Sequence, residues 1–328
     1  EWCPLGNVGT GDGESASAFR VKTALAYALF LWGTIRLNSL AHVTPDLCVA
    51  AAVYLTIGLC RRIVSGSGGW TASVLLGLAM SAGCLAKSSM YPLTIGPFLL
   101  LSLVPPFSWR RLGSLAIAAL VFLVTVGPYV FVLSNRQHRF TFGEAGRLNY
   151  AWAVQREIPL HIGWIGKPVS TGRPVHPPRM LREDPPVLEF SNTVPGTYPL
   201  WYDPAYFHEG LRVSFAFAKQ MITLKHSVAK FIQGPVSDQI PPLAGIIVIS
   251  ALAFRRRSRI GLQAMPGLGL LLWSLGACVM FSLVVIELRY LAPFVVLFWF
   301  ALYDIVVPHA LLVSDAACRS AVFVVAVS

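Results

Sequence analysis

The chain has 328 residues, of which 55% are hydrophobic and only 12% are charged, and its mean hydropathy is +0.64. Charged residues make up about a quarter of a typical soluble domain, so this composition excludes a soluble globular protein and predicts an integral membrane protein. The formal net charge of +11 is explained by Lys and Arg residues that set the orientation of the helices in the membrane, together with those of one long loop. No nucleic-acid partner is therefore expected. The six cysteines are not closely spaced and predict neither a disulfide framework nor a zinc site.

The first residues, "EWCPLGNVGTGDGESASAF", contain neither an initiator Met nor the charged and apolar regions of a signal peptide. We therefore expect that the chain lacks its natural N-terminus. Apolar runs then follow in chain order, and their lengths approach or exceed the roughly 17 residues that a membrane-spanning helix needs at minimum. The candidate spans are 23–40, 44–60, 70–86, 90–104, 112–134, 240–254, 264–286, 290–307 and 309–328, with the two short runs next to Pro pairs and the last the weakest.

Orientation follows from the basic residues, because cytoplasmic loops retain Lys and Arg. The inner side then holds Arg20, Lys22, Arg61, Arg62, Arg110, Arg111, Arg255, Arg256, Arg257 and Arg259. The short outer connections keep only Arg36, Lys87 and Arg289. The segment 135–239 falls on the outer side and is too long for a simple linker.

We therefore predict an all-α polytopic membrane protein with about 8–9 transmembrane helices and a mixed extracytoplasmic loop domain. Residues 1–134 form an N-terminal group of helices that is part of a larger helical domain. Residues 135–239 form the loop domain, and 240–328 form the C-terminal helices. Within the loop, 211–232 has an amphipathic pattern and is interpreted as a helix on the outer membrane surface, or alternatively as a helix that caps the loop domain.

Asp46 stands directly before the second apolar run, in "AHVTPDLCVA". One interpretation is structural: Thr44 is a good N-cap, Pro45 suits the first helical position, and an acid complements the positive end of the helix dipole. The other is functional, because ionisable residues at membrane helices are costly and this helix begins on the outer side.

Lys87 and the stretch "VVIELRYLAPF", with Glu287, Arg289 and Tyr290, fall on the same predicted face. Snorkelling would explain Lys87, and interfacial anchoring or a local ion pair would explain the others. Together, however, Lys87 and Arg289 offer a point charge and a planar fork, which are the groups that bind phosphate.

The loop stretch "GTYPLWYDPAYFHEG" surrounds Asp203 with aromatic residues, including Trp201. Such a group could bind a sugar or form the small core of the loop domain. We include Trp201 and Asp203 among the substrate-binding candidates.

The stretches "AHVTPDLCVAAAVYLTIGL", "WTASVLLGLAMSAGCLAKSSMYPL" and "IELRYLAPFVVLFW" resemble, in order and spacing, bacterial glycosyltransferases of the C superfamily (GT-C fold). This group includes protein O-mannosyltransferases and the lipid A aminoarabinose transferase. The resemblance covers about 20–134 and 264–307. It implies a polytopic enzyme of the bacterial inner (plasma) membrane that works on the extracytoplasmic face and takes its sugar from a polyprenyl phosphate.

The resemblance further implies that Asp46 is a catalytic or metal-contacting acid and that Lys87, Arg289 and Tyr290 lie at the donor phosphate. The family's leading general base would precede the first residue of this chain. Expected partners are a polyprenyl-phosphate-linked sugar, membrane lipids, and a glycan, lipid or protein acceptor, and a divalent metal stays open. The alternative is a transporter or flippase of a lipid-linked or anionic solute.

Overall fold

The computed structural model describes residues 16–37, 44–103, 108–143, 145–156, 173–174, 179–185, 187–189, 208–209, 213–233, 243–244, 247 and 265–311. Its long helices are α1 (Ala16–Arg36), α2 (Asp46–Val64), α3 (Gly69–Ala86), α6 (Trp109–Arg136), α9 (Phe217–Gln233), α12 (Met265–Ser282) and α13 (Leu288–Leu311). Shorter helical elements are α4 (Met90–Leu93), α5 (Ile95–Leu103), α7 (Ala145–Tyr150) and the π-helix η1 (Ala151–Gln155).

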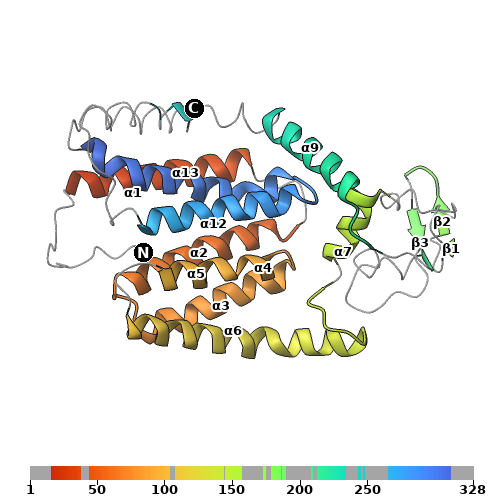
Figure 1. Cartoon of the computed structure of the whole chain (residues 1–328), viewed down its shortest axis with the longest axis horizontal. Coiled ribbons are helices and arrows are strands. Elements are labelled where there is room, and N and C mark those ends of the chain that lie inside the picture. Colours follow the sequence, from red (N-terminus) through yellow and green to blue (C-terminus); the bar gives the residue numbers. More distant parts are fainter. Residues whose placement is uncertain are drawn as a thin grey trace.

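Six long helices, α1, α2, α3, α6, α12 and α13, lie side by side as a bundle (Figure 1). Helix α3 packs between α2 and α6, and α13 packs against both α1 and α12. Within the described residues, α2, α3, α6 and the 288–305 part of α13 are each long and apolar enough to cross a membrane. The chain is thus a helical membrane protein, as its composition predicted. The predicted total of 8–9 spans is not confirmed: the helices at the expected spans 23–40, 90–104 and 264–286 are not among these four, and 240–254 and 309–328 lie mostly outside the described residues.

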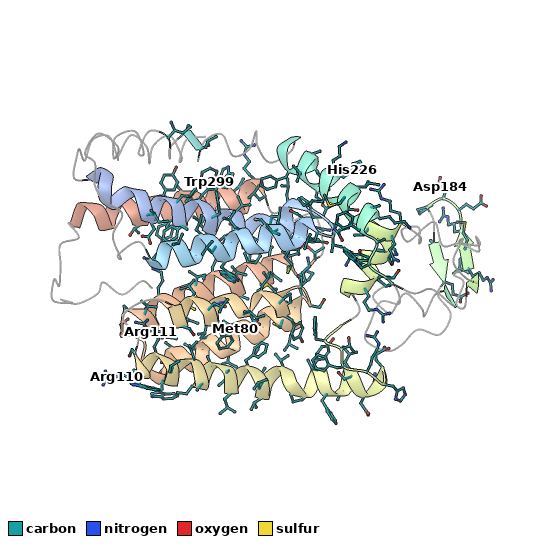
Figure 2. The ribbon with its side chains drawn as sticks, in the orientation of Figure 1. Met80, Arg110, Arg111, Asp184, His226 and Trp299 are labelled. Carbon is teal, nitrogen blue, oxygen red and sulfur yellow. The ribbon has the colours of Figure 1, made fainter. Side chains whose placement is uncertain are left out.

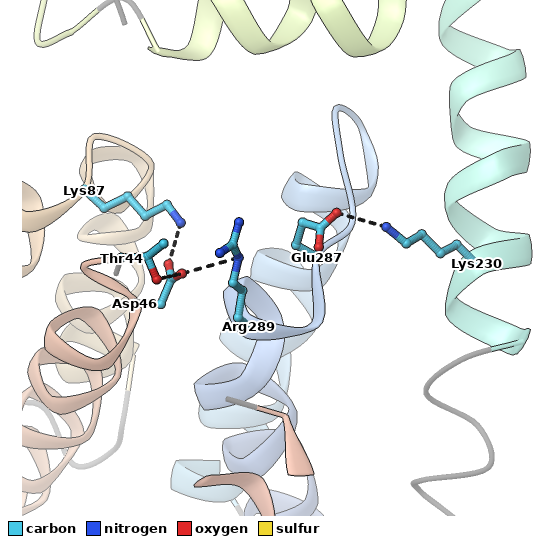
Figure 3. Close-up of polar contacts among 6 residues, drawn as sticks. All are labelled: Thr44, Asp46, Lys87, Lys230, Glu287 and Arg289. Atoms are coloured by element: carbon cyan, nitrogen blue, oxygen red, sulfur yellow. Dashed lines mark hydrogen bonds and ion pairs between the residues drawn. The ribbon is translucent and has the colours of Figure 1, made fainter. Parts of the chain in front are cut away.

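The two groups of predicted loop charges occupy opposite ends of this bundle. Arg61 and Arg62 lie in the last turn of α2, far from its first residue, Asp46. Arg110 and Arg111 lie at the start of α6, at the end of the bundle opposite to α9, which carries His226 (Figure 2). Lys87 and Arg289 lie at the α9 end (Figure 3), so among the described residues the structure separates four predicted inner cations, Arg61, Arg62, Arg110 and Arg111, from these two predicted outer ones.

The predicted short span 90–104 is two helices, because the helix is interrupted at Thr94, between α4 and α5. Pro97 has no N–H with which to bond the carbonyl of Leu93, four residues earlier. That carbonyl instead accepts a hydrogen bond from Trp273 Nε1 of α12 at 2.9 Å, and the Thr94 hydroxyl bonds the Tyr91 carbonyl at 2.7 Å. The hydrogen bond from Trp273 at this interruption therefore joins α12 to the N-terminal helices.

Small residues allow α3 and α6 to approach closely. A Cβ atom on Gly77 would lie 2.6 Å from the Ala118 carbonyl oxygen and 2.7 Å from Val121 Cβ. Packing in membranes relies on such small residues, since lipid supplies no hydrophobic force between helices.

Replacement of Gly77 with Ala is therefore expected to destabilise the fold by about 1–3 kcal/mol, because backbone at the contact cannot move aside. The matched control is Gly58→Ala on α2, where the added methyl would meet no atom within 4 Å. Thermal unfolding of the two variants in detergent would test the difference. An equal midpoint for both would contradict this packing.

Outside the bundle, residues from the predicted loop domain form short strands. They are β1 (Arg173–Pro174), β2 (Arg179–Arg182), β3 (Val187–Glu189) and β4 (His208–Glu209), and β1 pairs with β4 and β2 with β3, both antiparallel. The predicted helix 211–232 is observed as α9, which crosses the end of the bundle obliquely (Figure 1). It contacts both η1 and α12.

Candidate functional site: a buried carboxylate between two cations

Three helix ends meet at one end of the bundle and bring distant charged residues together (Figure 3). Asp46 is the first residue of α2, Lys87 directly follows the last residue of α3, and Arg289 is the second residue of α13. The structure thus groups three of the residues that the sequence placed on one face. We call Asp46, Lys87, Arg289 and Tyr290 the charge cluster.

Asp46 is the centre of this cluster and is only 5% exposed. Its Oδ1 accepts a hydrogen bond from Lys87 Nζ at 2.6 Å, and its Oδ2 accepts one from the Thr44 hydroxyl at 2.7 Å. Arg289 Nε lies 3.5 Å from Oδ2. Both carboxylate oxygens are therefore engaged within the protein.

The expected N-cap at Thr44 is wrong. Helix α2 is preceded by Pro45 at the N-cap position, with no side-chain capping hydrogen bond, and the Thr44 hydroxyl bonds the Asp46 carboxylate instead. Asp46 still complements the positive end of the helix dipole. Its direct partners, however, come from α3 and α13, so helix capping does not account for this acid.

Lys87 points into the protein and does not snorkel to the membrane surface. Its Nζ atom bonds Asp46 and lies 3.2 Å from the centroid of the Tyr290 ring, an arrangement typical of a cation–π contact. Burial lowers the pKa of Lys87 below its usual value, and this effect outweighs the hydrogen bond and charge of Asp46, which act in the opposite direction. Keeping Lys87 protonated at this buried position therefore costs free energy, which the contact with Asp46 offsets only in part.

Arg289 pairs with Asp46 through Nε and not through its two terminal nitrogens. In the part of the chain that the structure describes, this buried Nε atom has no hydrogen-bond partner, because 3.5 Å is a long contact. Figure 3 shows the contact between Arg289 and the Asp46 carboxylate drawn to Nε. The planar fork that binds phosphate is therefore not what holds the carboxylate.

Glu287 lies beside the charge cluster but does not form the expected local pair with Arg289. Its Oε1 pairs with Lys230 Nζ of α9 at 3.0 Å, and Lys230 also bonds the Ile286 carbonyl at 2.8 Å. This pair is much more exposed than the pair of Asp46 and Lys87. Trp201 and Asp203, the two candidates from the loop, lie outside the described residues.

Two partners in this region were not identified from the sequence. Thr44 was interpreted as a cap and not as a donor to Asp46, although it stands two residues away. Lys230 belongs to the amphipathic segment, whose regular spacing gave no sign that one of its lysines would reach Glu287 at the start of α13. The contact of Lys230 depends on how α9 packs against the bundle, whereas that of Thr44 is local.

The cluster is suited to an anion. One carboxylate faces two cations, so an unmatched positive charge stays at this end of the bundle. Among the described residues no group of three or more His, Cys, Asp or Glu side chains could hold a metal ion. At the opposite end Asp304, another acid within a span, pairs with Arg61 at 3.8 Å.

Searches of protein-family models, of characterised proteins and of solved structures found no match to this chain.

Proposed function

We propose that this chain is a bacterial membrane glycosyltransferase of the C superfamily, which transfers a sugar from a polyprenyl-phosphate donor to an extracytoplasmic acceptor. One observation carries the proposal. Lys87 and Arg289, which are far apart in the sequence, lie on a single buried carboxylate at one end of the bundle. Because the ion pair of Arg289 with Asp46 uses Nε, the terminal nitrogens can take a phosphate without breaking that pair.

The chemistry of transfer matches these residues. An acceptor oxygen attacks the anomeric carbon, the bond from that carbon to the phosphate oxygen breaks, and the electron pair leaves with the lipid phosphate. Such a leaving group is stabilised by cations and needs no acid. We assign Lys87 and Arg289 to the phosphate, with Tyr290 holding the Lys87 ammonium group.

Asp46 then has a positioning role and not the acceptor or metal contact that the resemblance implied. Its two carboxylate oxygens are already engaged by Thr44, Lys87 and the Arg289 guanidinium, and its charge holds two cations close together before the sugar donor binds. The pair of Glu287 with Lys230 uses Oε1, and we assign Oε2 of this more exposed acid to the acceptor hydroxyl, whose proton it takes.

The experiment follows a labelled sugar on polyprenyl phosphate in phosphatidylcholine vesicles that contain the full chain, with membrane extract as the source of acceptors. We expect the label to leave the lipid and enter the extract, and we expect Glu287→Gln to slow this transfer without weakening donor binding. If the label crosses the bilayer while still linked to its lipid, the protein is a flippase and the proposal is wrong. A label that stays on its lipid and on its original side also contradicts transfer.

A further inference from the structure

Helix α9 buries polar residues and exposes apolar ones, which is the reverse of the usual arrangement for a helix on a protein surface. The residues it buries are polar: Gln220, Thr223 and Ser227 are each less than 10% exposed. They recur at helical spacing and form one face. Two of them donate to backbone carbonyls of other elements, Gln220 to Leu283 at 2.6 Å and Thr223 to Ala153 at 3.3 Å. Polar contacts therefore hold this helix to the rest of the protein.

Its apolar residues are the exposed ones. Phe217, Met221 and Val228 are 69%, 46% and 49% exposed and, with half-buried Leu224, follow the spacing of one helix face. Phe231, near the end of the same face, packs against the core of the bundle. We call Phe217, Met221, Leu224 and Val228 the apolar stripe.

The position of α9 along the length of the bundle indicates what covers the apolar stripe. Gln220 and Lys230 bond the carbonyls of Leu283 and Ile286, which belong to the turn between α12 and α13. That turn lies at the ends of two apolar helices, where a membrane-spanning bundle leaves the hydrocarbon. A helix at this depth lies in the interface between headgroups and acyl chains.

We propose that α9 rests in the membrane interface, with the apolar stripe inserted among the lipid acyl chains. The apolar stripe is therefore covered by the same bilayer that the bundle spans. Exposed Lys225 lies next to the stripe on the helix and can reach lipid phosphates, as basic residues do in interfacial helices. The inference does not depend on the proposed enzymatic activity.

Spin labels attached to single cysteines would test this in phosphatidylcholine vesicles. The label sites are Met221 and Val228 on the stripe and, as the matched control, exposed His226 on the opposite side of the same helix. The six native cysteines would be replaced first. We expect the stripe labels to collide several-fold more with lipid-soluble oxygen, relative to a water-soluble nickel complex, than the label at His226 does.

Equal collision ratios at all three sites would place the stripe in water and overturn the proposal. Low collision with both reagents at the stripe would mean that protein covers it, which also overturns the proposal. If the cysteine-free chain does not fold, a photoreactive phenylalanine analogue at the same three positions gives the same decision. Cross-links to lipid from positions 221 and 228, but not from 226, are then required.

Discussion

Replacement of Lys87 or Arg289 with Gln is expected to weaken binding of polyprenyl phosphate by about 10–100-fold. A hydrogen bond to a charged group contributes about 1.5–3 kcal/mol, and each 1.4 kcal/mol corresponds to about tenfold in affinity. Binding would be measured with the full-length protein in vesicles or detergent and a fluorescent polyprenyl phosphate. The matched control is Arg62→Gln, which removes an exposed cation in the last turn of α2, at the opposite end of the bundle, and for which we expect unchanged affinity.

The pH dependence separates a direct role of Lys87 from a general loss of folding. Only the protonated amine binds phosphate, and the pKa of Lys87 is lowered by burial. Above about pH 8 the phosphate is fully ionised, so affinity should fall as the pH rises through the lowered pKa of Lys87. In a Lys87→Arg variant the guanidinium stays protonated, and this fall should disappear. The same fall in both proteins would show that Lys87 does not hold the phosphate.

The sequence predicted the bundle well where a helix is a simple apolar run. The expected spans 70–86 and 112–134 differ from α3 (Gly69–Ala86) and α6 (Trp109–Arg136) by only a few residues at each end. Membrane helices satisfy their own backbone, so hydropathy alone locates them. The run at 90–104 shows the limit of this argument. The interruption of this helix depends on Pro97 and on the hydrogen bond from Trp273 to the Leu93 carbonyl, and hydropathy contains no information about that contact.

The candidate site could be predicted in part. The topology placed Asp46, Lys87 and Arg289 on one face, and the structure brings all three together. Which acid pairs with which cation could not be predicted, because pairing depends on the packing of α2, α3 and α13. A local pair of Glu287 with Arg289, two residues apart, was one of the structural alternatives that the sequence left open. Residues so spaced at a helix start point in different directions, and each found its partner on another helix.

Removing the charge of Asp46 is expected to have the largest effect on stability. Asp46→Asn keeps the shape of the side chain but leaves Lys87 and Arg289, which are both largely buried, facing each other without a counter-charge. Breaking one side of a buried ion pair costs about 3–5 kcal/mol. The control at the same end is Glu287→Gln. It breaks the exposed pair with Lys230 and should cost no more than about 1 kcal/mol. Thermal or denaturant unfolding in detergent would compare the two.

The double variant Asp46→Asn with Lys87→Met decides whether the cost comes from the cations. Methionine keeps the apolar stem of Lys87 and removes its charge, so the second change relieves the repulsion created by the first. The double variant should therefore be less destabilised than the sum of the two single variants, since residues in direct contact are not additive. Additive costs would mean that Asp46 acts mainly through the start of α2 and that the cations do not depend on it. Coupling would show that Asp46 holds the Lys87 ammonium group beside Arg289, which is the arrangement of charges that a phosphate at this end of the bundle requires.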